Sequence, residues 1–168
     1  MTVQSINEAN TEQAKHLFLQ CCTSERWINS MVNARPYANS QDVRSQADDC
    51  WRDLGEEDYL QAFEGHPKIG DVGSLKAKYA NTKELAAGEQ FGMTVAADDI
   101  INTLAKGNID YEQKFGFIFI VCATGKSAQE MSDLLQARLP NERTSELGNA
   151  AEEQRKIFQI RLNQLLEG

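Results

Sequence analysis

Four polar side chains occupy positions where the apolar pattern of this chain predicts helix ends or inward-facing surfaces. They are His66, Glu89, Gln90 and Arg161. An imidazole can act as a general acid or base near neutral pH, and a guanidinium, an amide and a carboxylate can orient a small polar molecule through hydrogen bonds. Together these groups could bind a small anionic molecule, but the pattern alone does not show that they meet.

His66 lies where a helix is expected to break. Gly65 before it is an expected left-handed helix stop, and Pro67 after it disfavours the α conformation at residue 66. We therefore expect the imidazole at a helix C-terminus, where the partial negative charge of the helix end favours the protonated ring. The alternative is that His66 only caps its helix by bonding the last carbonyl groups.

Arg161 falls inside an apolar stripe, four residues after Ile157 and four before Leu165. A guanidinium that is buried there needs an acidic side chain or an anionic ligand as its partner. The alternative is a snorkelling side chain, whose stem packs against the core while the guanidinium reaches water.

Helical periodicity dominates the rest of the chain, with Asn10, Ser24, Ser40 and Ser127 as expected N-caps. The expected helices cover approximately residues 10–21, 24–34, 40–54, 59–63, 81–91, 98–106, 127–139 and 144–166. Gly107 is expected to close the helix over 98–106. The apolar run 115–123 is the exception, because its aromatic and β-branched residues are typical of a strand that has no visible partner. We interpret it as either a buried helix or an extended segment through the core.

Composition narrows the function classes. The 168 residues fit one domain covering 1–168, and 41% hydrophobic with 25% charged residues is typical of a globular protein. The net charge of −8 argues against general affinity for nucleic acid or anionic membranes, so an anionic substrate would need a locally positive pocket. No secretory signal or membrane span is visible, which favours a cytoplasmic protein, and the four cysteines are expected to be reduced core thiols.

The stretch from Phe63 to Asp71, Phe-Glu-Gly-His-Pro-Lys-Ile-Gly-Asp, resembles the signature of the OHCU decarboxylases of urate breakdown. OHCU is 2-oxo-4-hydroxy-4-carboxy-5-ureidoimidazoline. Further segments are similar to this family in order and approximate spacing: Trp27 with Arg35-Pro36-Tyr37, Glu89-Gln90, Lys114 to Phe117, Cys122 to Ser127, Arg138-Leu139 and Ile160 to Leu162. The resemblance therefore covers nearly the whole chain.

This resemblance implies an all-α, single-domain compact multi-helix bundle that works as a homodimer without cofactor or metal and converts OHCU to (S)-allantoin and carbon dioxide. By the same likeness the catalytic residues are His66 and Glu89. The implied substrate-binding residues are Pro67, Gln90, Phe119, Ile120, Val121, Cys122 and Arg161, with main-chain groups of 119–122 binding the ring. One departure is Ala86, which stands where the family usually has serine three residues before the glutamate.

Two rival functions remain open. A metal enzyme could use His66, Asp71 and Glu89 as ligands, although the only other imidazole is His16. A non-catalytic helical module could bind a small ureide or purine-like ligand, with Ala86 marking a diverged site.

Overall fold

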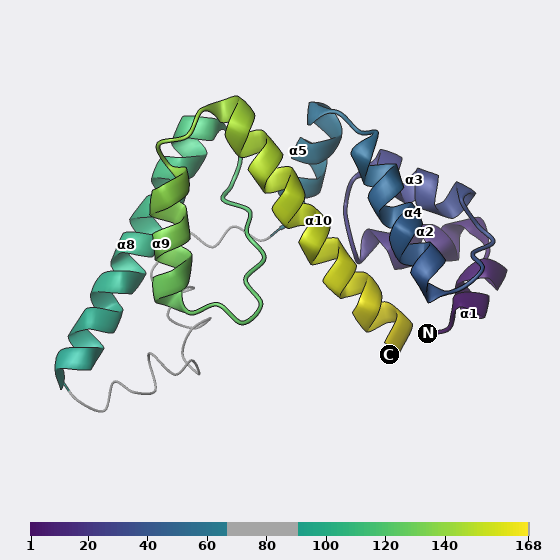
Figure 1. The fold of residues 1–168 in the computed structure, drawn as a ribbon, viewed down its shortest axis with the longest axis horizontal. Coiled ribbons are helices and arrows are strands. Elements are labelled where there is room, and N and C mark those ends of the chain that lie inside the picture. Colours follow the sequence, from purple (N-terminus) through teal and green to yellow (C-terminus); the bar gives the residue numbers. More distant parts are fainter. Residues whose placement is uncertain (67–90, 168) are drawn as a thin grey trace. The chain divides into compact units, whose positions relative to one another are not determined.

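The computed structural model describes residues 1–66 and 91–167, with the backbone alone described over 91–97. In these ranges the chain is all-helical, as predicted, with eight helices and no strand (Figure 1). The helices are α1 (Val3–Glu8), α2 (Thr11–Leu19), α3 (Glu25–Asn33), α4 (Ser40–Arg52), α5 (Glu56–Glu64), α8 (Phe91–Phe115), α9 (Ala128–Arg138) and α10 (Arg143–Glu167). None of them combines the length and the apolar composition needed to cross a bilayer.

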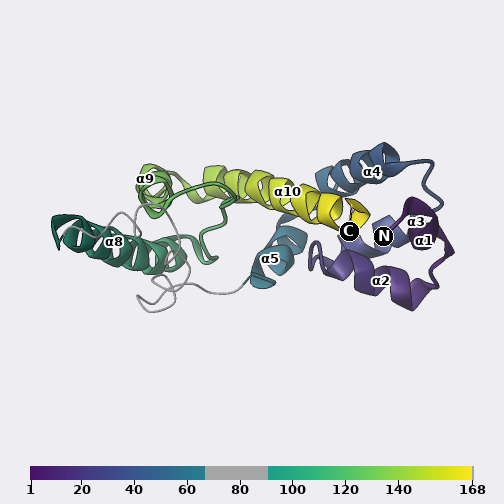
Figure 2. The same cartoon turned by 90° about the horizontal axis from the view of Figure 1, so that it is seen from below.

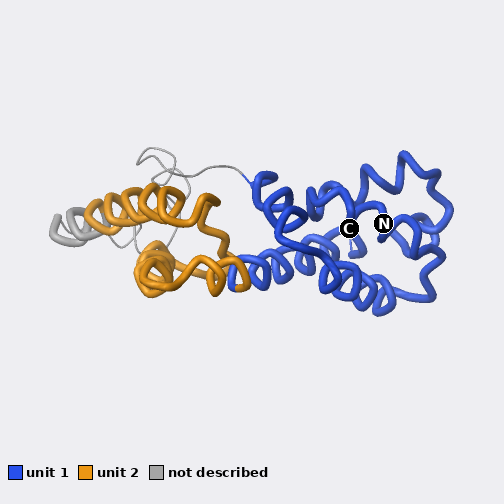
Figure 3. Tube along the Cα trace, turned by 90° about the horizontal axis from the view of Figure 1, so that it is seen from above, with its two compact units in different colours: residues 1–66, 149–168 blue, residues 67–148 orange. Residues whose placement is uncertain are grey.

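The chain divides into two compact units (Figure 3). Unit 1 comprises residues 1–66 and 149–168, and unit 2 comprises residues 67–148. The prediction of a single domain over 1–168 stays a prediction.

Local capping chemistry sets the helix starts of unit 1. The side chains of Asn10 and Ser24 accept the expected hydrogen bonds from main-chain N–H groups in the first turns of α2 and α3. Ser40, however, was wrongly predicted as the cap of the next helix. Asn39 takes that role, because its extended backbone lets its side-chain oxygen accept from Asp42 N at 2.8 Å.

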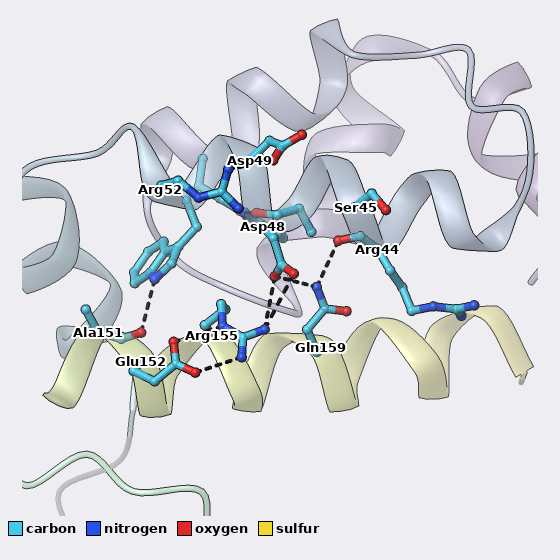
Figure 4. Close-up of polar contacts among 12 residues, drawn as sticks. Arg44, Ser45, Asp48, Asp49, Arg52, Ala151, Glu152, Arg155 and Gln159 are labelled. Atoms are coloured by element: carbon cyan, nitrogen blue, oxygen red, sulfur yellow. Dashed lines mark hydrogen bonds and ion pairs between the residues drawn. The ribbon is translucent and has the colours of Figure 1, made fainter. Parts of the chain in front are cut away.

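In unit 1, α10 lies along α4 (Figure 4). Trp51 of α4 is buried and donates from Nε1 to the main-chain oxygen of Ala151 at 3.0 Å. One turn further along α10, Arg155 pairs with Asp48 at 3.3 Å. Asp48 therefore pairs across the two helices and does not simply face solvent.

In unit 2, helices α8 and α9 lie side by side (Figures 1 and 2). Gly107 was predicted to close a helix, and this was wrong, because Gly107 lies inside α8. A Cβ at this position would stand 2.4 Å from Leu135 Cδ2, so glycine is needed for the close approach of α9.

Extended backbone follows α8. Gly116 ends this helix with a φ of 82°, and residues 117–123 contain no helix. Of the two interpretations of run 115–123, the extended segment is therefore confirmed. Cys21, Cys22 and Cys122 form no disulfide and are buried, as predicted, whereas Cys50 forms no disulfide but is only half-buried.

Candidate active site

His66 directly follows the end of α5, as predicted, but Gly65 serves a different purpose from the one expected. Its φ of −72° is right-handed, so no left-handed stop occurs. A Cβ at residue 65 would instead lie 2.1 Å from Thr23 Oγ1. The hydroxyl of Thr23 donates to the main-chain oxygen of Gln61 at 3.0 Å, which fixes the α2–α3 loop against the end of α5. Glycine at 65 therefore permits a close contact beside the histidine.

The imidazole of His66 does not cap its own helix. Its main-chain N–H donates to Phe63 O at 3.1 Å, while ring atom Nε2 lies 2.5 Å from Oε1 of Gln154 on α10. Burial lowers the pKa of His66 below its usual value of 6.5, and the Gln154 bond opposes this shift only in part. The expectation that the helix end favours the protonated ring was wrong, because desolvation outweighs it.

Arg161 stands near His66 in unit 1, since its positive charge also contributes to the lowered pKa of the imidazole. The guanidinium is half-buried and donates from Nη1 to the main-chain oxygen of Cys21 at 3.2 Å. Within the described residues its partner is thus a carbonyl group rather than a carboxylate. The charge of Arg161 is not neutralised there and is suited to attract an anion.

The extended segment of unit 2 has buried side chains at Phe119, Ile120 and Cys122, and a half-buried one at Val121. Because no strand pairs with it among the described residues, its carbonyl groups need other donors. Cationic side chains provide them: Arg138 donates to Ile120 O at 2.7 Å and Lys126 to Cys122 O at 2.7 Å. The carbonyl groups of Ile120 and Cys122 are therefore already hydrogen-bonded, and both of their donors carry a positive charge.

Arg138 is itself held by a buried polar cluster. Its Nε lies 2.7 Å from Oε1 of Glu146, which is fully buried and also accepts from the hydroxyl of Tyr111 at 2.5 Å. The guanidinium carbon lies 4.7 Å from the centre of the Phe119 ring. This cluster fixes the arginine that bonds Ile120.

The sequence analysis assigned no role to Gln154, Arg138 or Glu146. A signal was present for Gln154, because this polar residue falls at helical spacing among the apolar Ala150, Ala151 and Phe158 of the last helix. The pattern did not name its partner, because His66 is 88 residues away from Gln154 in the chain.

Pro67, Glu89 and Gln90 lie outside the described residues, as do Asp71, Ala86 and most of the expected helix over 81–91. Their assigned roles stay predictions, and so do those of Phe119 to Cys122. In the part of the chain that is described, no three His, Cys, Asp or Glu side chains are grouped as metal ligands.

Comparison with known proteins gives a consistent set of relatives. The family model described as OHCU decarboxylase matches residues 7–163. The uric acid degradation bifunctional protein TTL of Arabidopsis thaliana is 33% identical over 147 residues, which are 86% of this chain and 45% of that protein. The 2-oxo-4-hydroxy-4-carboxy-5-ureidoimidazoline decarboxylase of Amia calva is 28% identical over 80% of this chain and 77% of its own. The chain thus spans less than half of the bifunctional relative but most of the single-function one.

Solved structures agree with the sequence relatives. A crystal structure of OHCU decarboxylase in the presence of (S)-allantoin matches with a TM-score of 0.73 and 31% identity, covering 95% of this chain and 100% of that one. A crystal structure of (S)-allantoin synthase, at 13% identity, shares the fold with a TM-score of 0.70. By the extent of the family match and the similarity of these relatives, the chain belongs to the OHCU decarboxylase family.

Proposed function

We propose that this chain catalyses the decarboxylation of OHCU to (S)-allantoin and carbon dioxide without a cofactor. The observation that carries the proposal lies in unit 1: the desolvated imidazole of His66 is near Arg161, whose guanidinium has no carboxylate partner among the described residues. A substrate with a carboxylate needs such a positive group, and the proton-transfer step needs a group that titrates near neutral pH.

For this decarboxylation the protein has to orient the substrate, provide a poorly solvated site and supply a proton. The bond between the ring carbon and the carboxylate breaks, carbon dioxide leaves, and the electron pair is delocalised into the conjugated ring until a proton is added to carbon. A poorly solvated site favours this step, because the carboxylate loses its charge as carbon dioxide departs. Burial of His66 supports its use as the proton donor, since a buried imidazolium gives up its proton more readily than one in water.

Roles follow for the individual residues. His66 orients the carboxylate and is the first candidate to deliver the proton, and Arg161 binds the anionic substrate. Glu89 is assigned to substrate positioning beside the leaving carboxylate, and Gln90 to the ring and ureido groups. Pro67 and main-chain groups of 119–122 complete the assigned contacts.

The experiment generates OHCU in place from urate with the preceding enzymes and follows the circular dichroism of (S)-allantoin. The chain is expected to accelerate formation of one enantiomer above the spontaneous rate. His66→Asn should lower the turnover number by about 10²- to 10⁴-fold, the usual contribution of a general acid or base. His16→Asn is the matched control, because His16 is exposed on α2. A folded His66→Asn protein with wild-type turnover would refute the role of His66, and a wild-type chain that binds allantoin without turnover would be a binding module.

A homodimer and a cytoplasmic location are also part of the proposal. Light scattering on the purified chain tests the first, where a mass of one 18.8 kDa subunit at micromolar concentration would count against it. Fractionation of the source cells tests the second.

A further inference from the structure

Gln154 occupies a position where an apolar side chain would be expected. It is fully buried on the inner face of α10, between the buried Ala150 and Ala151 on one side and the buried Phe158 on the other. Helical spacing on this face predicts leucine or a similar residue. A buried amide has to be satisfied by hydrogen bonds, so its presence needs a reason.

The amide of Gln154 is satisfied on one side only. Its Oε1 faces Nε2 of His66 at 2.5 Å, while its Nε2 has no hydrogen-bond partner among the described residues. An arrangement that leaves a buried donor unused is unfavourable for folding compared with an apolar side chain of the same size. Among the described residues, the bond to the imidazole is the interaction of Gln154 that a leucine could not make.

We propose that Gln154 is the positioning residue of His66, holding the ring through Nε2 so that Nδ1 is the atom that exchanges a proton with the substrate. This inference rests on the proposed function. An amide oxygen accepts from Nε2–H whether the ring is neutral or charged, so the ring keeps its orientation throughout proton transfer. A carboxylate in the same place would stabilise the imidazolium and oppose release of the proton.

The charges that act on the ring are considered for the described residues only, 1–66 and 91–167. Arg161 of α10 acts on it directly. Glu64 of its own helix is exposed. On the α2–α3 loop beside Arg161, burial raises the pKa of Cys21 to about 11 and that of Cys22 to about 12, so both thiols are uncharged at neutral pH. Gln154 is therefore the neutral group that sets the hydrogen bonding of the ring.

The test measures His66 itself as well as turnover. The chain has only two histidines, so nitrogen-15 labelling of histidine gives two imidazole titration curves, with His16 as the internal reference. Gln154→Leu is expected to lower the pKa of His66 and Gln154→Glu to raise it. Gln159→Leu is the matched control: it removes an amide from the same helix, where it bonds Arg44 O and Asp48, without touching His66.

Turnover should change in parallel. Gln154→Leu is expected to lower the turnover number by about 10- to 100-fold with a smaller effect on KM, because a misplaced catalytic group loses rate rather than binding. In Gln154→Glu, the limb of the pH–rate profile that reports His66 should shift to higher pH. Gln159→Leu should leave both the titration of His66 and the profile unchanged.

Three results would overturn the inference. The pKa of His66 could stay the same in both Gln154 variants, which would show that the bond does not act on the ring. It could rise in Gln154→Leu, which would show that the amide donates to the ring instead. It could shift as expected while turnover is unaffected, which would show that the bond does not serve catalysis. Absence of turnover in the unaltered chain would instead refute the proposed function, and the titration curves would still report whether Gln154 holds the ring.

Discussion

Replacing Gly65 by alanine tests why glycine precedes the histidine. The backbone there is right-handed, with a φ of −72°, so alanine is conformationally acceptable. By restricting the unfolded chain, alanine would by itself stabilise the protein by about 0.4–1 kcal/mol. Against this, the new Cβ would stand 2.1 Å from Oγ1 and 2.5 Å from Cγ2 of Thr23.

The clash with Thr23 should decide whether Gly65→Ala raises or lowers the free energy of unfolding. Overpacking of this kind costs about 1–3 kcal/mol. Displacing Thr23 also weakens its hydroxyl bonds to Gln61 O and Ala62 O, at about 1 kcal/mol. After subtraction of the entropic gain, Gly65→Ala should lower the free energy of unfolding by about 1–3 kcal/mol. In a Thr23→Gly background the clash is gone, and the same change should stabilise the protein by about 0.4–1 kcal/mol.

Urea unfolding of the four proteins in this double-mutant cycle measures both values and their difference. Gly148→Ala is the control, because a Cβ there meets nothing within 4 Å and alanine in a helix should stabilise by about 0.8–1 kcal/mol. If Gly65→Ala destabilises equally with threonine and with glycine at 23, the close approach of Thr23 is not the reason for Gly65.

Three further predictions concern stability. Because burial lowers the pKa of His66, the unfolded chain binds a proton that the folded chain refuses, so the free energy of unfolding should fall as pH drops from 6.5 through the lowered pKa, and His66→Gln should remove this part of the dependence in urea titrations at several pH values. Arg138→Met should lower the free energy of unfolding by about 3–5 kcal/mol, because it leaves the buried charge of Glu146 without its cation, and thermal melts of Arg138→Met against Arg138→Met with Glu146→Gln should show partial rescue. Trp51→Phe should lose about 1 kcal/mol or more with its bond to Ala151 O, and a loss no larger than that of an exposed substitution would contradict this contact.

Helix starts were predictable where one residue alone offers capping chemistry. Asn10, Ser24 and Ser127 were identified as caps because their side-chain oxygens bond N–H groups only three residues away. At 39–40 two suitable residues are adjacent, and the local sequence does not choose between them. The extended backbone at Asn39 decides, and that backbone depends on the chain before it.

Glycines were the weaker guide, because the same residue type serves opposite purposes. Gly116 does end a helix with positive φ, whereas Gly107 continues one so that Leu135 can approach. Gly65 precedes a break without adopting the left-handed conformation. In the last two cases the reason is a side chain from a distant part of the sequence, which a local pattern does not contain. The expected roles of His66 and Arg161 came from family resemblance, and the structure adds their proximity within unit 1.

The spacing of residues on α10 explains how one helix places two groups, Gln154 and Arg161, that act on the imidazole of His66. Gln154 and Arg161 are seven residues apart, which is two turns, so they project from the same face with a rise of about 10 Å between their Cα atoms. The first supplies the acceptor for Nε2 of His66, and the second places a positive charge near the ring while bonding Cys21 O. A straight helix fixes this separation more rigidly than two loops would. One helix therefore places both the acceptor that raises the pKa of His66 and the cation that lowers it, and the two act on a pKa that burial has already lowered.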